Sequence, residues 1–369
     1  MIKVGITGNK GFLGRHLHNY LQLNENIEII PFESSYFQEP IQLQAFVKSC
    51  DSIVHLAAVN RHPDADELYR INIDLVEKLV RACEDTDSRP HIIMSSSTQE
   101  YQDNPYGRSK LKGREVLELW ANKNNAMTSG LIIPNIFGPF GRPNYNSFIA
   151  TFCHRLIHNE KVEIIVDSDV SLIYVNDLVK DIAEIILNKS KGKIEIRPRY
   201  TAKVSKTLAM LEGFKACYME KGEFPQLMDP FEIDLFNTFR SYLPEDFFPF
   251  FYTKHEDDRG AFVEVVRSMG KGQFSYSTTK PGITRGNHFH TRKIERFAVI
   301  DGKALIQIRK IDDDKVIEYI ISGDQPAFVD MPIWYTHNIK NIGEGILTTL
   351  FWINESYDPT DADTYFIPV

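Results

Sequence analysis

The sequence predicts two domains of different fold class, an α/β domain with a parallel sheet followed by an all-β domain. Residues 1–246 alternate short apolar runs with stretches of helical periodicity, the pattern of a parallel sheet covered by helices. From residue 261 the chain reads as short β-type runs separated by turn residues, which favours a jelly roll or barrel. Between them, the segment 243–252 is rich in aromatic residues, and its two prolines argue against a continuing helix. We therefore expect one domain at 1–246 and a second at 247–369.

Composition and charge exclude several classes of function. The chain has 369 residues, 43% of them hydrophobic and 25% charged, which is an ordinary globular balance. The net charge of −8 and the scattered basic residues give no case for a nucleic-acid partner. No apolar run approaches the ~18 residues of a membrane span, and the chain enters a strand directly after Met1, without a signal peptide. Because four widely spaced cysteines suit a reducing compartment, we expect a cytoplasmic protein with no membrane insertion.

The first apolar run, Ile2 to Thr7, leads through a glycine-rich turn into a helical pattern. Strand, glycine turn and helix are the context that a dinucleotide fingerprint requires. Glycines let the backbone approach a pyrophosphate, and the helix N-terminus supplies free N–H groups. The alternative is a close strand-to-helix turn without a ligand. The turn residues that we expect to bind a cofactor are Gly8, Gly11, Phe12, Leu13 and Gly14.

The residues leave the choice between NADH and NADPH open. An acidic residue at the end of the second strand, 27–31, would favour NAD by bonding the ribose hydroxyls, and Phe32 and Glu33 straddle that position. Arg15, directly after the glycine turn, could meet a 2′-phosphate or be a solvated helix residue. A third apolar run, 51–59, ends in small residues such as Ala57, where an edge of the cofactor could pass.

A fourth strand at 91–94 ends in three serines and is followed by Tyr106-Gly-Arg-Ser-Lys110. Tyr106 and Lys110 are four residues apart, so they share one face of a helix. A free tyrosine has a pKa of ~10, and a neighbouring ammonium group lowers it. A serine at the end of the strand, Ser97 in preference to Ser96, can hold a carbonyl oxygen. Together with Tyr106 and Lys110 it forms an acid set, the group of residues that protonates a ketone oxygen during hydride addition. The alternative is a surface pair of tyrosine and lysine.

The order of TGxxGxxG, HLAA, SSS and YxxxK resembles the extended short-chain dehydrogenase/reductase family over about residues 1–240. The resemblance implies a Rossmann domain that binds NAD(P). Residues 134–139 resemble the substrate loop of the nucleotide-sugar members, which implies Asn135 as a substrate residue, and 174–177 resemble their late strand. Two departures are a short loop between Ser96 and Tyr106 and Val170 at the usual place of a phosphate-pairing arginine. Arg142 is therefore a candidate for binding the diphosphate.

The C-terminal half carries two histidine motifs. The first spaces Gly282, His288, His290, Glu295 and Gly302 as G-x5-H-x-H-x4-E-x6-G. Residues two apart in a strand share a face, so His288 and His290 can enter one cavity, which Glu295 can reach from a neighbouring strand. The second motif spans 332–341 and supplies His337. Three imidazoles and a carboxylate suit Zn, Mn, Fe, Ni or Cu, whereas the alternative is a solvated hairpin that carries HxH by chance.

Both motifs resemble the cupin family, which implies a jelly-roll fold and a bound metal. The first motif matches at every fixed position. The second, P-x-G-x2-H-x3-N, has Trp334 where glycine is usual, a departure that bears on the local turn and the width of the pocket and leaves the fourth ligand in place.

Segments 258–264 and 284–288 resemble the D-R-G-x-F-x-E and R-G-x-H signatures of deoxysugar 3,5-epimerases. The resemblance implies that Arg285 pairs with a substrate phosphate and that His288 is the catalytic base, and it makes Arg259 a candidate substrate residue. Those epimerases use no metal, and His288 cannot be both a tightly held ligand and a free base. We favour zinc, held by His290, Glu295 and His337, with His288 as a fourth ligand or as a base beside the metal.

Over the whole chain, the combination resembles the bifunctional bacterial enzymes that make UDP-N-acetyl-L-fucosamine for capsular polysaccharides. The resemblance implies a homodimer that acts on a UDP-linked 4-keto-6-deoxy amino sugar. The cupin would epimerise a UDP-2-acetamido-2,6-dideoxy-4-hexulose at C3, and the reductase would use NADPH to give UDP-2-acetamido-2,6-dideoxy-L-talose. Two alternatives stay open. The cupin could be only a dimerisation or sugar-binding module of a ketoreductase, or its metal could be redox-active iron in a dioxygenase.

Overall fold

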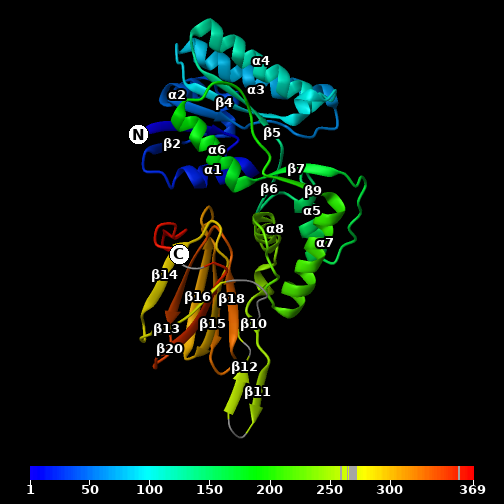
Figure 1. Ribbon diagram of the computed structural model, residues 1–369. Coiled ribbons are helices and arrows are strands. Elements are labelled where there is room, and N and C mark those ends of the chain that lie inside the picture. The colour runs from blue at the N-terminus through cyan, green and yellow to red at the C-terminus, as the bar shows by residue number, and fades with distance from the viewer. Residues whose placement is uncertain (258–259, 264, 266–271, 356–357) are drawn as a thin grey trace. The chain divides into compact units, whose positions relative to one another are not determined.

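The computed structural model describes residues 1–369 except 258–259, 264, 266–271 and 356–357 (Figure 1). The chain forms two compact units, which we call unit 1 and unit 2. Unit 1 comprises Met1–Phe137, Tyr145–Ser147 and Ser168–Ala202, and unit 2 comprises Gly138–Asn144, Phe148–Asp167 and Lys203–Val369. Packing therefore groups residues 203–246 with the C-terminal strands, and the domain boundary at 246/247 stays a prediction from the sequence.

Unit 1 is built on a six-stranded parallel sheet in the order β2-β1-β3-β4-β5-β8. The chain runs outward from β1 in both directions, so the carboxyl ends of β1 and β3 form the switch point at which such sheets bind ligands. This confirms the predicted Rossmann domain with its parallel sheet. The strands are β1 (Ile2–Thr7), β2 (Ile27–Ile30), β3 (Ser52–His55), β4 (His91–Ser97), β5 (Thr128–Ile133) and β8 (Gly192–Glu195).

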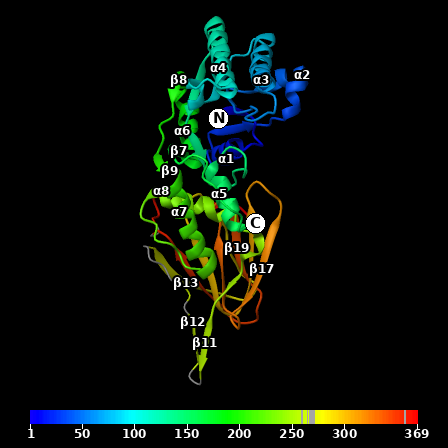
Figure 2. The same ribbon diagram turned by 90° about the vertical axis from the view of Figure 1, so that its right-hand side faces the viewer.

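Helices cover both faces of this sheet (Figures 1 and 2). Ile53 packs with one set of helices and its neighbour Val54 with the other, because side chains alternate along a strand. Burial on both faces explains why the strands read as continuous apolar runs. One face carries α1 (Phe12–Leu21) and α6 (Val175–Asn188), and the other carries α2 (Pro40–Ser49), α3 (Ala65–Asp85) and α4 (Pro105–Asn124). Smaller elements are η1 (Ser34–Gln38), η2 (Thr98–Tyr101) and the sheet of β6 (Asn135–Phe137), β7 (Asp169–Tyr174) and β9 (Tyr200–Lys203).

The helices of unit 2 pack against one another. They are α5 (Phe148–Ile157), α7 (Val204–Phe214), α8 (Pro230–Arg240) and the short η4 (Glu245–Phe247), and α7 continues into a π-helical turn, η3 (Lys215–Met219). The sequence predicts helices at 210–218 and 231–243. Both are present, as α7 with η3 and as α8, but their ends differ from the predicted ones. Among the described residues, no helix combines the length and apolar character needed to cross a bilayer. All four cysteines of the chain are unpaired thiols, three of them buried, as expected.

The remainder of unit 2 consists of antiparallel strands, as the sequence predicts for the C-terminal half. Two five-stranded sheets have the orders β10-β18-β15-β20-β13 and β17-β16-β19-β14-β21, and β11 pairs with β12 in a hairpin. The aromatic rings of Phe297 and His337, one from each sheet, lie 5.5 Å apart, so the sheets face each other. The strands are β10 (Phe250–Phe251), β11 (Lys254–Asp257), β12 (Gly260–Val263), β13 (Gln273–Thr279), β14 (Thr284–Phe289), β15 (Glu295–Asp301), β16 (Lys303–Lys310), β17 (Val316–Ser322), β18 (Ala327–Met331), β19 (Tyr335–Asn341), β20 (Leu347–Ile353) and β21 (Tyr365–Phe366).

Candidate functional site

In unit 1, the glycine turn after β1 packs tightly against the end of β3. A Cβ added to Gly8 (φ +73°) would lie 2.8 Å from the backbone nitrogen of Ala57, and one added to Gly14 would lie 2.2 Å from the Gly8 carbonyl oxygen. The Thr7 hydroxyl bonds Nδ1 of His55 at 2.8 Å and accepts the Ala57 N–H at 3.3 Å. Burial, with Lys110 nearby, lowers the pKa of His55 to about 3, so this contact is neutral. The turn thus has the tight bend and the close packing of helix on strand that glycines provide in dinucleotide-binding turns.

The end of β2 carries the residues that bear on NAD against NADP. The Glu33 carboxylate pairs with Lys10 at 2.7 Å, and both side chains are exposed. Arg15 is exposed on α1. Lys10 therefore offsets the acidic charge at the position expected to meet the ribose, and the preference for NADPH stays a prediction.

Tyr106 and Lys110 lie together on α4, as their spacing predicts. The Lys110 ammonium is 5.7 Å from the centre of the Tyr106 ring and donates to the Ser95 carbonyl at 2.9 Å. Burial, with a smaller effect of Tyr145, raises the pKa of Tyr106 to about 12, and burial lowers that of Lys110 to about 8. Burial therefore outweighs the lowering that the sequence predicts from Lys110. A phenol with this pKa is protonated near neutrality, as a proton donor must be.

The three serines at the end of β4 have different partners. The Ser96 hydroxyl donates to Glu100 at 2.7 Å, whereas the Ser97 hydroxyl accepts the Gln99 N–H at 3.2 Å. Alternation along β4 places Ser97 on the same face as Ser95, the residue that contacts Lys110. This arrangement favours Ser97 over Ser96 as the serine of the acid set.

The predicted substrate residues fall in different segments. Asn135 is exposed at the start of β6, with Nδ2 3.5 Å from the Ser171 carbonyl oxygen. Arg142 is exposed in the 138–144 segment of unit 2. Arg285 is exposed on β14 and donates to the Thr278 carbonyl at 3.2 Å. Arg259 lies outside the described residues, so its predicted role stays a prediction.

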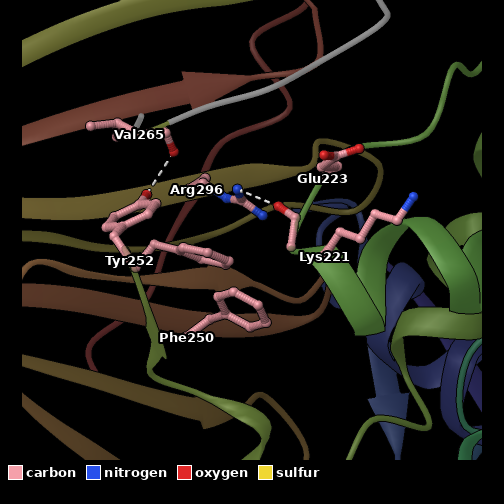
Figure 3. A pocket seen from close by; sticks show the side chains of 8 residues that line it. Lys221, Glu223, Phe250, Tyr252, Val265 and Arg296 are labelled. Carbon is pink, nitrogen blue, oxygen red and sulfur yellow. Dashed lines mark hydrogen bonds between the residues drawn. The ribbon is translucent and has the colours of Figure 1, made fainter. Parts of the chain in front are cut away.

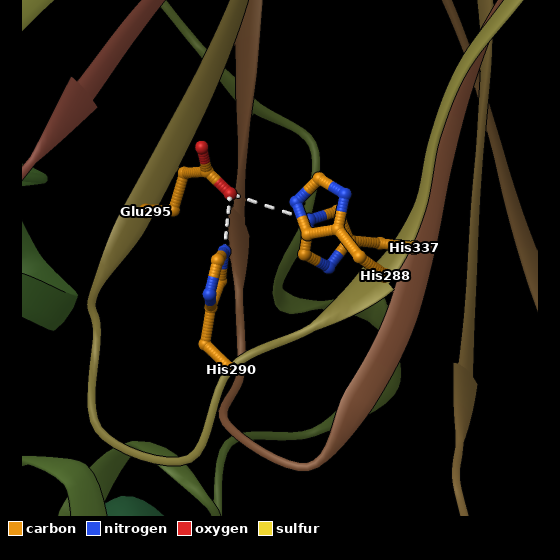
Figure 4. A group of neighbouring side chains, drawn as sticks. All are labelled: His288, His290, Glu295 and His337. Atoms are coloured by element: carbon orange, nitrogen blue, oxygen red, sulfur yellow. Dashed lines mark hydrogen bonds and ion pairs between the residues drawn. The ribbon is translucent and has the colours of Figure 1, made fainter. Parts of the chain in front are cut away.

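In unit 2, the four predicted metal-binding side chains converge on one point (Figure 4). One ligand atom from each of His288, His290, Glu295 and His337 lies within 4.8 Å of the other three. His288 lies on β14, with His290 just beyond its end, and His337 lies on β19 of the same sheet, whereas Glu295 begins β15 of the facing sheet. The cluster therefore lies between the two sheets.

A β-bulge in β14 sets the direction of the first histidine. Gly286 pairs with Asn338 but His288 pairs with His337, so Asn287 is the extra residue, and it has φ +61°. A Cβ on Gly286 (φ +99°) would lie 2.8 Å from the His337 carbonyl oxygen. The close approach of the two strands thus requires glycine at position 286.

The Glu295 carboxylate joins the histidines of this cluster. Its Oε2 lies 3.1 Å from Nε2 of His290 and 3.2 Å from Nε2 of His337. Burial acts to raise the pKa of Glu295, but the bond from His290 and the charges of both histidines outweigh it and hold that pKa well below its usual range. Burial and the neighbouring histidines lower the pKa of His288 to about 4. An ionised carboxylate among imidazoles is a cation-binding arrangement.

The surroundings of the His337 ring show whether these residues suit a metal. The Nε2 atom of His337 is buried. It lies within ion-pair distance of the Glu295 carboxylate but without the geometry of a hydrogen bond. Within the described part of the chain, this nitrogen therefore has no hydrogen-bond partner. A buried nitrogen in that state is costly unless it binds a cation. With two more imidazoles and a carboxylate beside it, the set fits a divalent metal such as zinc.

Trp334 keeps the turn for which cupins commonly use glycine. Its backbone has φ +63°, the left-handed conformation that glycine favours, and its N–H donates to the His290 carbonyl at 2.8 Å. The buried ring stacks on Phe289, with centres 5.5 Å apart. Because Phe289 points to the opposite face of β14 from His288, the Trp334 ring lies away from the histidine cluster and does not narrow it.

The residue after Glu295, Arg296, faces the other way into a second polar cluster, and it also lines the pocket drawn in Figure 3. The buried Arg296 guanidinium donates to Asp330 at 2.8 and 3.0 Å and to the Gly222 carbonyl at 2.9 Å, and the Tyr218 hydroxyl also donates to Asp330. These bonds tie β15 to the η3 turn and the loop after it, and so support the strand that carries Glu295. A cavity of 140 Å³ beside them is lined by Lys221, Gly222, Glu223, Phe250, Tyr252, Val265, Arg296 and Phe328, none of them a predicted site residue.

Sequence reasoning missed the group that orients His290. Its Nδ1 lies 2.5 Å from the backbone carbonyl oxygen of Asp363, which is 73 residues further along the chain. No spacing rule connects the two segments. The only local signal is a small polar run, Thr360-Asp-Ala-Asp363-Thr, near the end of the chain.

Comparison with known proteins matches both halves. Residues 4–196 match the NAD dependent epimerase/dehydratase family, and residues 255–365 match the polysaccharide biosynthesis C-terminal domain. A Pseudomonas aeruginosa protein described as UDP-2-acetamido-2,6-beta-L-arabino-hexul-4-ose reductase is 34% identical over 99% of this chain and 98% of its own length. A Bacillus subtilis spore coat polysaccharide biosynthesis protein, SpsL, is 29% identical over 31% of this chain and 83% of its own length.

A solved structure extends the likeness to the whole fold. The capsular polysaccharide assembling protein CapF from Staphylococcus aureus is 35% identical, with a TM-score of 0.62 and complete coverage of both chains. The chain therefore belongs to the NAD dependent epimerase/dehydratase family and, over its full length, to the CapF-type bifunctional enzymes that join this domain to a polysaccharide biosynthesis C-terminal domain.

Proposed function

We propose that this protein converts a UDP-2-acetamido-2,6-dideoxy-4-hexulose in two steps, C3 epimerisation in the cupin and C4 reduction in the NADPH-binding domain, to UDP-2-acetamido-2,6-dideoxy-L-talose. The observation that carries the proposal is the presence in one chain of a Tyr–Lys acid set and a buried cluster of three histidines and a glutamate. The full-length likeness to a UDP-sugar 4-keto reductase supports the substrate class. The product would serve capsular polysaccharide synthesis, and we expect a homodimer.

The reduction step uses the residues at the end of β4 and the start of α4. When bound, NADPH supplies the hydride that adds to the C4 carbon. Tyr106, protonated because its pKa is about 12, donates its proton to the C4 oxygen. Lys110, held by the Ser95 carbonyl, stabilises the resulting phenolate, and Ser97 holds the carbonyl oxygen in line.

The epimerisation step uses the histidine cluster. A ketone at C4 acidifies the proton at C3, and a divalent metal held by His290, Glu295 and His337 would polarise that ketone as a Lewis acid. His288 is the most exposed of the three histidines, and its pKa of about 4 leaves it neutral near pH 7. It therefore suits the role of base, taking the C3 proton before reprotonation on the other face inverts that carbon.

The two steps explain why the domains are fused. Epimerisation alone settles to a mixture of C3 epimers, because the enolate can be reprotonated on either face. Reduction of C4 removes the acidifying ketone and stops further exchange at C3. The reductase thereby draws the mixture toward one product.

The test is exchange at C3. The Tyr106→Phe protein is incubated with a UDP-4-keto-6-deoxy-HexNAc in heavy water without NADPH, and the C3–H signal is followed by NMR. We expect deuterium to enter at C3. No exchange in a folded, metal-bound protein would leave the cupin as a structural or sugar-binding module of a ketoreductase.

Two further measurements separate the alternatives. If the cupin only stabilises a dimer, His290→Ala should lower stability and leave the C3 configuration of the product unchanged. An altered product ratio in the folded variant would contradict that alternative. Metal analysis of the purified protein distinguishes zinc from the iron that a dioxygenase would need.

A further inference from the structure

The loop between β14 and β15 is held by one acidic side chain. This loop, residues 290–294, follows His288 and precedes Glu295. The buried Asp363 carboxylate accepts four hydrogen bonds from it: Oδ1 from the N–H and the hydroxyl of Thr291, at 3.0 and 2.7 Å, and Oδ2 from the N–H groups of Arg292 and Lys293, both at 3.0 Å. A carboxylate that accepts several backbone N–H groups is a strong, charge-assisted anchor.

The backbone of Asp363 also acts on the cluster directly. Its carbonyl oxygen can only accept, so the 2.5 Å contact requires a hydrogen on Nδ1 of His290. With Nδ1 engaged in this bond, Nε2 is the ring nitrogen left for a metal, and it lies on the side of Glu295, whose Oε2 is 3.1 Å away. Partners of this kind fix the tautomer and orientation of metal-binding histidines. Asp363 has φ +41°, a left-handed conformation that aspartate and asparagine tolerate better than most residues.

Other bonds attach the C-terminal segment to unit 2 independently of this carboxylate. Strand β21 pairs with β14, placing Phe366 opposite His288. The Ile367 N–H donates to the Asn287 carbonyl at 2.9 Å, and the Thr336 hydroxyl donates to the Ile367 carbonyl at 2.5 Å. Loss of the Asp363 carboxylate should therefore loosen the 290–294 loop without detaching the segment.

We propose that Asp363 is a positioning residue of the metal centre, which holds His290 in its ligating orientation through its carbonyl and keeps the following loop in place through its carboxylate. The inference rests on the proposed function, which places a divalent metal on this cluster. Asp363→Asn is the variant that tests the carboxylate, because asparagine keeps the size of aspartate and its tolerance of positive φ. Its amide group has a single acceptor oxygen, so either Thr291 or the pair of N–H groups from Arg292 and Lys293 would face an NH₂ group instead.

Asp361 provides a matched control. It lies two residues earlier and pairs with Arg292 of the same loop at 2.9 Å, but it is exposed and does not reach His290. The full-length wild type, Asp363→Asn and Asp361→Asn are stripped of metal. Zinc affinity is then measured by competition with a chromogenic chelator, the visible spectrum is recorded with Co²⁺, and the Tm of the metal-free protein is compared.

We expect zinc affinity to fall ~10- to 100-fold in Asp363→Asn, with a changed Co²⁺ spectrum, and to stay within about twofold in Asp361→Asn. A folded Asp363→Asn protein with wild-type zinc affinity and Co²⁺ spectrum would overturn the inference. If that variant does not fold, Thr291→Val removes only one of the four bonds, and an unchanged zinc affinity there would overturn it as well. A wild-type protein that binds neither ion would overturn the proposed metal centre, and this inference with it.

Discussion

The glycine turn of unit 1 and the histidine cluster of unit 2 are assembled in different ways. The turn is formed by residues 8–14, between one strand and the next helix, with support from the end of the neighbouring strand β3. The cluster combines ligands from 288–295 with His337 from another strand and an orienting carbonyl from Asp363. A local site can be recognised from spacing alone. A site assembled by pairing distant strands shows its ligands in the sequence but hides what orients them.

The largest expected effect tests whether the two regions act independently. Tyr106→Phe removes the proton donor, so we expect NADPH oxidation to slow by ~100- to 10,000-fold while C3 exchange in the cupin persists. Tyr101→Phe is the matched control, because that exposed hydroxyl donates to Glu195 at the surface of unit 1. Both rates are measured on the same preparations, by NADPH absorbance and by NMR. Retained NADPH oxidation would remove Tyr106 as the acid, and loss of C3 exchange would show that the two regions are coupled.

A smaller effect is expected from filling the space of one glycine. In Gly14→Ala the new Cβ would lie 2.2 Å from the Gly8 carbonyl oxygen and 2.8 Å from Cα of Asn9, so the backbone of the turn must move. We expect a loss of about 2 kcal/mol in the free energy of unfolding and weaker NADPH binding, because overpacking typically costs 1–3 kcal/mol.

Gly213 in α7 is the control for that substitution. It is exposed, and an added Cβ would meet no atom within 4 Å, so Gly213→Ala should stabilise by up to about 1 kcal/mol. Urea unfolding and NADPH titration measure both variants. Wild-type NADPH affinity in Gly14→Ala would contradict the tight glycine turn.

The same contrast explains what could be predicted from the sequence. Both fold classes and the meeting of the four candidate metal-binding side chains follow from periodicity and motif spacing, since each depends on local geometry. Helix α3 begins at Ala65, before its periodic apolar positions, because the Asp64 side chain caps the helix by accepting the N–H groups of Asp66 and Glu67. The capping aspartate is a local signal for the start of a helix, and hydrophobic periodicity alone does not detect it.

Other features depend on contacts that no spacing encodes. The raised pKa of Tyr106 comes from burial and from Tyr145, a residue of a later segment. The anchoring of the 290–294 loop comes from Asp363 near the end of the chain. Burial and long-range hydrogen bonds appear only once the fold is known, so the sequence predicts which groups meet but not their ionisation or their supports.

The smallest expected effect is a pH dependence of stability in the sheet of unit 1. His91 is buried at the start of β4, with Nε2 2.7 Å from the Ser129 hydroxyl. Burial, with Lys189 nearby, lowers the pKa of His91 from 6.5 to about 4. The unfolded chain therefore binds the extra proton first as the pH falls, so the stabilisation from His91 is complete above pH 6.5 and is lost progressively between pH 6.5 and 4.

One pKa unit corresponds to about 1.4 kcal/mol, so preferential protonation of His91 in the unfolded chain should lower the free energy of unfolding by about 1 to 2 kcal/mol between pH 7.5 and 5. Urea unfolding followed by circular dichroism at both pH values measures the loss, and His91→Asn should show a smaller one because asparagine does not titrate. An equal pH dependence in the two proteins would show that protonation of other groups controls the loss. Since His91 lies at the opposite end of the parallel strands from the glycine turn, NADPH affinity should not follow this titration.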